Sequence, residues 1–112
     1  MQFRSNARSS FALVVAMLFM TFSTPIARAA ESDQVLIKDF TFAPMSITVK
    51  TGATISWLNK DDEPHTVISD TGLFRSGALD TNDKFSFKFE KPGAYHFTCS
   101  IHPRMVGAIV VE

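Results

Sequence analysis

Short runs in which apolar and polar residues alternate, separated by turn residues, make up the chain from about residue 34 onward. The clearest run is Phe85 to Phe89, where phenylalanine occupies every second position. A period of two indicates strands with one buried face, and no stretch has the 3.6-residue period of an amphipathic helix. The predicted strands are 34–40, 46–50, 54–58, 65–69, 85–89, 94–99 and 106–111, with an irregular or short edge segment at 73–79. The pattern predicts an all-β fold, a single antiparallel Greek-key β-sandwich of about seven to eight strands.

The first 29 residues have a different character. Arg4 and Arg8 precede an apolar run at 11–22, and Ala27-Arg28-Ala29 offers small residues at the positions that a signal peptidase recognises. We therefore expect a secretory signal peptide at 1–29, followed by one domain at 30–112 that is exported to the periplasm. An uncleaved membrane anchor is the alternative. The apolar run is shorter than the roughly 20 residues of a membrane span, so we expect no membrane association after cleavage.

The charge of the domain argues against polyanionic partners such as nucleic acid. The leader contains three of the 11 basic residues and none of the 11 acidic ones, so the remaining domain is mildly acidic. It has no basic block of the kind that binds nucleic acid or an anionic membrane. Three consecutive acids, Asp61-Asp62-Glu63, fall in a polar stretch that we interpret as a surface loop rather than a calcium site.

The domain has a single cysteine, so it can form no internal disulfide. Exported domains of this size commonly need such a cross-link, because they bury a modest fraction of their surface. An odd cysteine in an exported protein indicates an intermolecular bridge, a reactive thiol or a metal ligand. A bound metal would also supply the missing stabilisation, because a ligand that binds only the native state stabilises that state.

Cys99, His102 and Met105 stand together in a C-x₂-H-x₂-M pattern after an apolar strand. Strand alternation puts Cys99 on the same face as Tyr95 and Phe97, which is the inner face because both are large and mostly apolar. Taken alone, Cys99 could equally be an inert core residue. The imidazole and thioether close by favour a metal site instead.

A second imidazole has to come from elsewhere in the chain. His65, at a loop-to-strand junction after Pro64, is the candidate; His96 has the opposite parity to Cys99 and is expected at the surface. Met105 is the expected weak ligand, with Met45 as the alternative. One Cys and two His in a plane with a distant Met are typical of a blue-copper electron-transfer centre.

Four segments carry a resemblance to a known family. They are Asp39-Phe40-Thr41-Phe42-Ala43-Pro44, Trp57-Leu58-Asn59-Lys60-Asp61, Pro64-His65-Thr66-Val67 and Tyr95 to Met105. With these segments the chain resembles the cupredoxins, the small blue-copper proteins, and most closely their amicyanin-like and pseudoazurin-like branch. The resemblance implies a sandwich with one type 1 copper at one end, held by His65, Cys99, His102 and Met105.

The resemblance also implies that His102 protrudes through an apolar patch where redox partner proteins dock. Ile101, Pro103 and either Pro44 or Met45 are expected to contribute to that patch. Two residues depart from the family pattern: Thr66 follows the first histidine where many relatives have asparagine, and Arg104 places a cation within the ligand loop.

These features predict a soluble, monomeric periplasmic electron carrier that is not an enzyme. A copper storage or delivery protein is the alternative, because the same four ligands would serve it. An oxidase or nitrite reductase needs a second copper centre and more than the three histidines of this chain. A metal-free adhesive sandwich is the remaining alternative.

Overall fold

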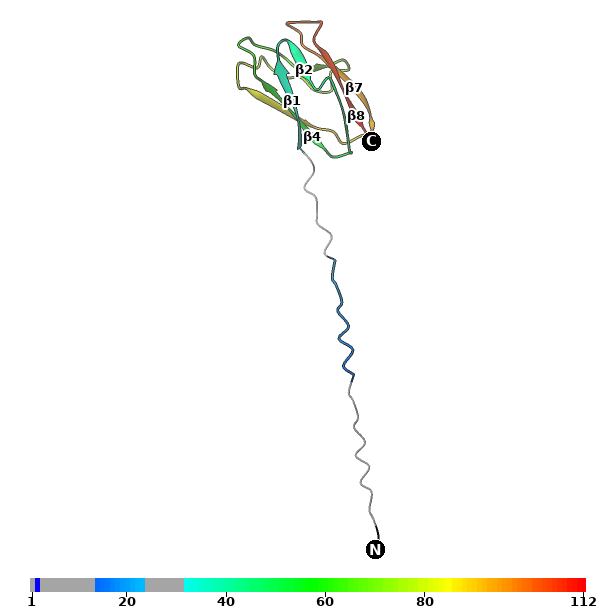
Figure 1. The fold of residues 1–112 in the computed structure, drawn as a ribbon. Coiled ribbons are helices and arrows are strands. Elements are labelled where there is room, and N and C mark those ends of the chain that lie inside the picture. The colour runs from blue at the N-terminus through cyan, green and yellow to red at the C-terminus, as the bar shows by residue number, and fades with distance from the viewer. Residues whose placement is uncertain (1, 3–13, 24–31) are drawn as a thin grey trace.

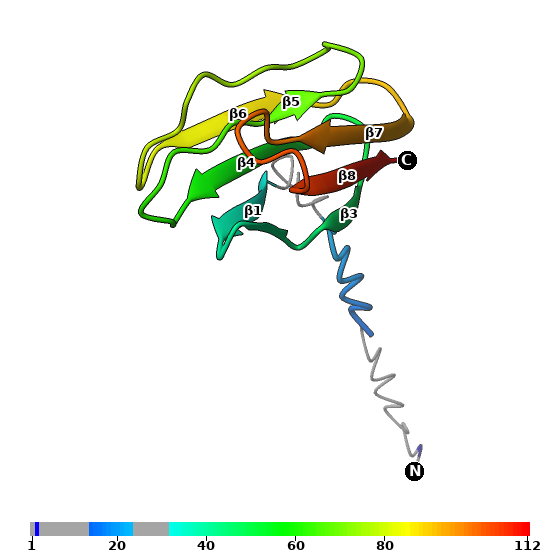
Figure 2. The same ribbon diagram turned by 90° about the horizontal axis from the view of Figure 1, so that it is seen from above.

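Eight strands in two four-stranded sheets form the body of the protein in a computed structural model, which describes residues 2, 14–23 and 32–112 (Figure 1). The strands are β1 (Ser32–Lys38), β2 (Thr41–Ala43), β3 (Ser46–Val49), β4 (Thr54–Asn59), β5 (Ile68–Ser69), β6 (Lys84–Lys88), β7 (Gly93–Thr98) and β8 (Val106–Val111). One sheet has the order β2-β1-β4-β6 and the other the order β3-β8-β7-β5, and the two face each other as layers (Figure 2). The all-β sandwich prediction is confirmed.

Both sheets are mixed rather than purely antiparallel. The β1 strand pairs in parallel with β4, and β3 pairs in parallel with β8; the remaining pairs are antiparallel. Each parallel pair joins strands that are not consecutive in the chain, so the connections cross between the sheets. The sheets are held by contacts between distant parts of the sequence.

The core lies between the sheets, on the faces that the alternation predicts. Val35 and Ile37 of β1 are fully buried, as are Ile55 and Trp57 of β4. The Trp57 ring packs edge-on against Phe97 of β7, with ring centroids 5.3 Å apart. Aromatic rings in this arrangement contribute beyond the area that they bury, which partly offsets the lack of a disulfide.

The strand predicted at 34–40 ends two residues early, in a tight turn that leads into a second, short strand. The β1 strand ends at Lys38, Asp39 and Phe40 both adopt a positive φ of 52° and 56°, and β2 returns antiparallel with Thr41 opposite Lys38. Positive φ at both central residues is the geometry of a type I′ hairpin, whose usual sequence signal is glycine in the second position. Phenylalanine stands there instead, which hides the turn from pattern analysis.

The strand predicted at 65–69 is also shorter than expected. Only Ile68–Ser69 form β5, while His65 makes an isolated bridge to Leu79 and Ile68 one to Arg75. The segment expected to be irregular, 73–79, therefore supplies the partners of this stretch. The polar segment between Asn59 and His65 is a loop, as predicted.

Within the predicted signal peptide the structure describes residue 2 and residues 14–23; the latter have neither helix nor strand, and their large apolar side chains are exposed. No helix among the described residues is long and apolar enough to cross a membrane. The expected signal-peptide cleavage after Ala29 falls outside the described residues.

Of the five glycines, Gly107 of β8 leaves the least room for a side chain. It lies opposite Phe97 in register, and a Cβ atom there would be 2.4 Å from Cζ of that ring. We expect Gly107→Ala to lower the free energy of unfolding by about 1–3 kcal/mol through overpacking, measured by urea denaturation. Gly77→Ala is the control, because nothing lies within 4 Å of its added Cβ; equal effects of the two substitutions would contradict this packing.

Candidate metal centre

The loop between β7 and β8 is folded back on itself by two backbone hydrogen bonds. Cys99 N–H donates to the Met105 carbonyl at 3.1 Å, and Met105 N–H donates to the His102 carbonyl at 2.9 Å. The loop is the orange-red connection at the end of the sandwich away from the C-terminus (Figure 1). Cys99 and Met105 are thereby held at the two ends of one short loop, with His102 between them.

His65 reaches the same end of the sandwich from the other side. Its backbone exchanges two hydrogen bonds with Leu79, of 3.1 Å and 2.7 Å, which fix it although it lies outside any named strand. The side chain is fully buried. A histidine in that position has to find polar partners, because an unpaired buried polar group is costly.

Three donor atoms from these two segments converge. His65 Nδ1 and His102 Nδ1 are 3.2 Å apart, and Cys99 Sγ lies 3.8 Å from the former and 3.9 Å from the latter. All three atoms lie within 4.8 Å of one another, and no other group of three or more His, Cys, Asp or Glu residues meets this condition among the residues that the structure describes. Cys99 and His65 are fully buried, whereas the His102 side chain is 28% exposed.

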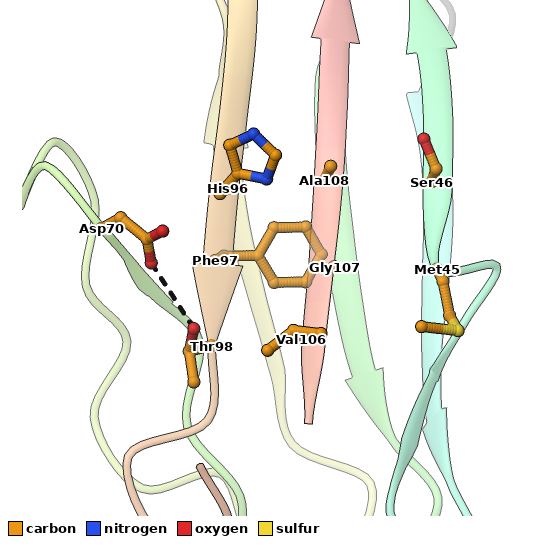
Figure 3. A pocket seen from close by; sticks show the side chains of 9 residues that line it. All are labelled: Met45, Ser46, Asp70, His96, Phe97, Thr98, Val106, Gly107 and Ala108. Carbon is orange, nitrogen blue, oxygen red and sulfur yellow. Dashed lines mark hydrogen bonds between the residues drawn. The ribbon is translucent and has the colours of Figure 1, made fainter. Parts of the chain in front are cut away.

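Met105 and Met45, the two candidates for a weak thioether ligand, lie in different environments. Met105 is buried at 4% exposure in the same loop as Cys99 and His102. Met45 is 59% exposed and lines a hollow on the outer face of β7 and β8, together with the exposed His96 (Figure 3). The β8 strand separates Met45 from His96 in that view, and neither belongs to the group of three donors.

Thr66 contacts the cysteine sulfur through both its backbone and its side chain. Its N–H donates to Cys99 Sγ at 3.4 Å, and its hydroxyl lies 3.8 Å from the same sulfur. The hydroxyl oxygen also accepts the Ser100 N–H at 2.8 Å and is hydrogen-bonded to the Ser100 hydroxyl at 2.8 Å. A threonine in this position therefore ties the strand after His65 to the ligand loop.

Asp61 supports the opposite side of the His65 ring. Its Oδ2 atom lies 2.8 Å from His65 Nε2, and the carboxylate also accepts the backbone N–H groups of Asp39 and Phe40. Burial raises the pKa of Asp61, but the hydrogen bonds that it accepts outweigh burial, and the pKa of this carboxyl lies below its usual range. The polar sequence around Asp61 predicted only a surface loop, and its place four residues before His65 was the one signal of this contact.

An apolar surface surrounds the exposed edge of His102. Phe40, Ile101, Pro103, Arg104 and Met105 line a hollow with it, and Phe40 and Ile101 are each 46% exposed. The expected contribution of Ile101 and Pro103 agrees with this lining, whereas Phe40 takes the place that we expected for Pro44 or Met45. On the other side of His102, a Glu63 carboxylate oxygen lies 3.9 Å from Nε2.

The donor chemistry fits a copper ion. A thiolate is a soft ligand that suits Cu(I), imidazole suits several transition metals including copper, and a His₂Cys set beside a thioether is typical of blue-copper sites. The burial of two of the three donors, with a sulfur that already accepts hydrogen bonds, matches a site held in place by the protein.

Comparison with known proteins also indicates a blue-copper protein. The chain is 33% identical over 93 residues to amicyanin-alpha of Methylorubrum extorquens, which covers 74% of each protein. Among solved structures, a novel purple cupredoxin from Nitrosopumilus maritimus aligns with a TM-score of 0.66 and 32% identity over 71% of this chain and 99% of that one. A copper-containing nitrite reductase from Thermus scotoductus aligns with a TM-score of 0.69 and 25% identity, but this chain matches only 22% of its length.

The family model described as "Cupredoxin-like domain" matches residues 10–111. That match spans nearly the whole chain and includes both segments that supply the converging donors. The chain therefore belongs to the cupredoxin family, with a single type 1 copper ion as its cofactor.

Proposed function

We propose that this cupredoxin is a one-electron carrier, and that His65, Cys99, His102 and Met105 hold its copper. The observation that carries the proposal is the convergence of one cysteine sulfur and two Nδ1 atoms within 4.8 Å. When bound, the copper supplies a Cu(II)/Cu(I) couple that accepts or gives up one electron. The chain contributes the rest, which is a fixed arrangement of donors that suits both oxidation states.

The protein holds each donor by contacts that do not depend on the metal. The ligand loop is closed by backbone hydrogen bonds, His65 is bridged to Leu79, and Thr66 donates to Cys99 Sγ. A site with fixed donors changes little in geometry when the metal changes oxidation state, and small reorganisation favours fast electron transfer. Hydrogen bonds to the sulfur also tune the potential.

Redox partner proteins are proposed to dock over the apolar surface around His102. His102 is the one of the three converging donors whose side chain reaches solvent, at 28% exposure. Phe40 and Ile101 provide exposed apolar area beside it, and Arg104 adds a positive charge at the rim. A surface of this kind suits brief complexes, since apolar contact excludes water and the charge favours some partners over others.

We also propose that residues 1–29 are a signal peptide and that the domain at 30–112 acts in the periplasm as a monomer. The proposal is supported by the basic start, the short apolar run and the small residues before Ala30. A single cysteine that serves copper, rather than a disulfide, is compatible with an exported domain. Amino-terminal sequencing of the protein from the periplasmic fraction tests the cleavage site.

Electron transfer is favoured over copper delivery and over catalysis. Delivery calls for a site from which the metal exchanges readily, whereas His65 and Cys99 are fully buried and the spare donors His96 and Met45 lie on another face. A copper oxidase or nitrite reductase uses a second copper centre, and the described residues hold one converging group. Copper exchange that outpaces electron self-exchange would favour delivery instead.

The proposal is tested by the visible spectrum and the EPR spectrum of the Cu(II)-loaded protein. We expect intense visible absorption from thiolate-to-copper charge transfer, and we expect Cys99→Ser to abolish it, because the hydroxyl is a much weaker electron donor than the thiolate. Copper content is measured in parallel, so that loss of colour is separated from loss of metal. Strong colour in the variant, or no colour in the unmodified protein, would refute the ligand assignment.

Met105 and Met45 offer a matched pair for the thioether ligand. Met105→Leu is expected to shift the reduction potential and the EPR parameters, at a cost in stability below about 1.5 kcal/mol because the volume is nearly conserved. Met45→Leu should leave the potential unchanged, since this side chain is 59% exposed on another face. Voltammetry of both variants decides; the opposite pattern would assign Met45 instead.

Thr66 is expected to raise the reduction potential through its hydroxyl. Thr66→Val keeps the shape of the side chain but removes the O–H group near Cys99 Sγ, which leaves a more electron-rich sulfur that stabilises Cu(II). We expect the potential to fall by on the order of 40 mV, the equivalent of one net hydrogen bond of about 1 kcal/mol. Thr66→Ser should retain the unmodified potential, and an unchanged value in the valine variant would show that the hydroxyl does not act on the sulfur.

A further inference from the structure

The turn between β1 and β2 has an unusual backbone. Asp39 and Phe40 both have a positive φ, 52° and 56°, although neither is glycine. Aspartate enters this region at modest cost, but for a bulky residue such as phenylalanine it is a genuine outlier. Conformations of this kind persist only where surrounding contacts determine them, and they cluster at functional sites.

Both backbone N–H groups of this turn donate to one carboxylate. Asp61 Oδ1 accepts the Asp39 N–H at 2.7 Å, and Oδ2 accepts the Phe40 N–H at 3.0 Å. The backbone of Asp61 is itself held in place, because its N–H donates to the Asn59 side-chain oxygen at 2.9 Å and its backbone carbonyl accepts the Thr81 hydroxyl at 2.6 Å. Asp61 therefore acts as a fixed acceptor around which the turn is built.

The same carboxylate contacts a donor of the metal centre. Oδ2 lies 2.8 Å from His65 Nε2, and the Asp61 side chain is only 10% exposed. A carboxylate at Nε2 favours the tautomer with its proton on that nitrogen and leaves the Nδ1 lone pair directed at the other donors. The ring of His65 cannot flip without breaking this bond.

The same turn also places an aromatic ring against the two histidines of the metal centre. The Phe40 ring lies edge-to-face with the His65 ring, at a centroid distance of 5.4 Å, and with the His102 ring, at 4.9 Å. Phe40 is also 46% exposed. One partly exposed side chain thus contacts both imidazoles, and it borders solvent beside them.

We propose that Asp61 is a positioning residue for the metal centre, which with one carboxylate fixes the His65 ring and holds Phe40 as a cover over the two imidazoles. The proposal rests on the proposed function only in taking these imidazoles as copper ligands. It predicts that the cover keeps water from the metal, and that the cover and the ligand geometry are lost together when the carboxylate is removed.

The first test uses the metal-free protein, so that it does not depend on copper. In ¹⁵N-labelled unmodified protein, NMR should show His65 as a single tautomer with a slowly exchanging proton on Nε2. Asp61→Ala should give mixed tautomers and at least about tenfold faster exchange of that proton, as expected for the loss of a charge-assisted hydrogen bond. The control is Asp62→Ala, which removes the charge of the neighbouring exposed residue, a carboxylate without these contacts.

The second test measures water-proton relaxation by the Cu(II)-loaded proteins. Asp61→Ala and Phe40→Ala should both increase the relaxation rate relative to the unmodified protein, and Asp62→Ala should not. If Asp61→Ala does not fold, the His65 tautomer of the unmodified protein and the effect of Phe40→Ala decide the matter.

The proposal is overturned if the His65 proton resides on Nδ1 in the unmodified protein. It is equally overturned if Asp61→Ala matches Asp62→Ala in the NMR measurement, or if Phe40→Ala leaves water relaxation unchanged. A protein that shows the expected tautomer but forms no coloured copper complex would refute the proposed function and leave the role of Asp61 at His65 standing.

Discussion

The structure depends on bringing one thiol and two imidazoles to a single buried point from segments more than thirty residues apart. Cys99 and His102 come from the β7–β8 loop and His65 from the connection before β5, with their donor atoms 3.2–3.9 Å from one another. Burying polar groups without partners is unfavourable, so the fold has to hold each ring and the sulfur by contacts of its own. Thr66 and Asp61 make those contacts on two different sides.

The two-sheet architecture makes this convergence possible. The β7 strand, which leads into Cys99, belongs to one sheet, while β1, which leads into the Asp39–Phe40 turn, belongs to the other. Both segments finish at the same end of the sandwich, so the ligand loop and the turn meet across the gap between the sheets (Figures 1 and 2). The core beneath them, centred on Trp57 and its aromatic neighbours, supplies the rigidity that a domain with no disulfide would otherwise lack.

Local features of this fold could be predicted from the sequence, whereas features made by side chains far apart in sequence could not. The alternation in β7 correctly places Tyr95, Phe97 and Cys99 inside and His96 outside, because strand parity is a property of neighbouring residues. The β1–β2 turn was missed because its glycine signal is absent, and what stabilises it is a carboxylate twenty-one residues away from Phe40. Asp61 was taken for an ordinary surface acid for the same reason, since its partners become neighbours only in the folded chain.

This distinction bears on what makes a cupredoxin site rigid. The C-x₂-H-x₂-M pattern specifies which atoms are available, but the loop that bears it is held by only two backbone hydrogen bonds of its own. Its position relative to His65 is set by Thr66, which bonds to Cys99 and to Ser100, and by Phe40, which contacts both imidazoles. Donor geometry is therefore a property of the contacts between the two segments, and a transplanted ligand loop would need matching residues at 40, 61 and 66 to reproduce it.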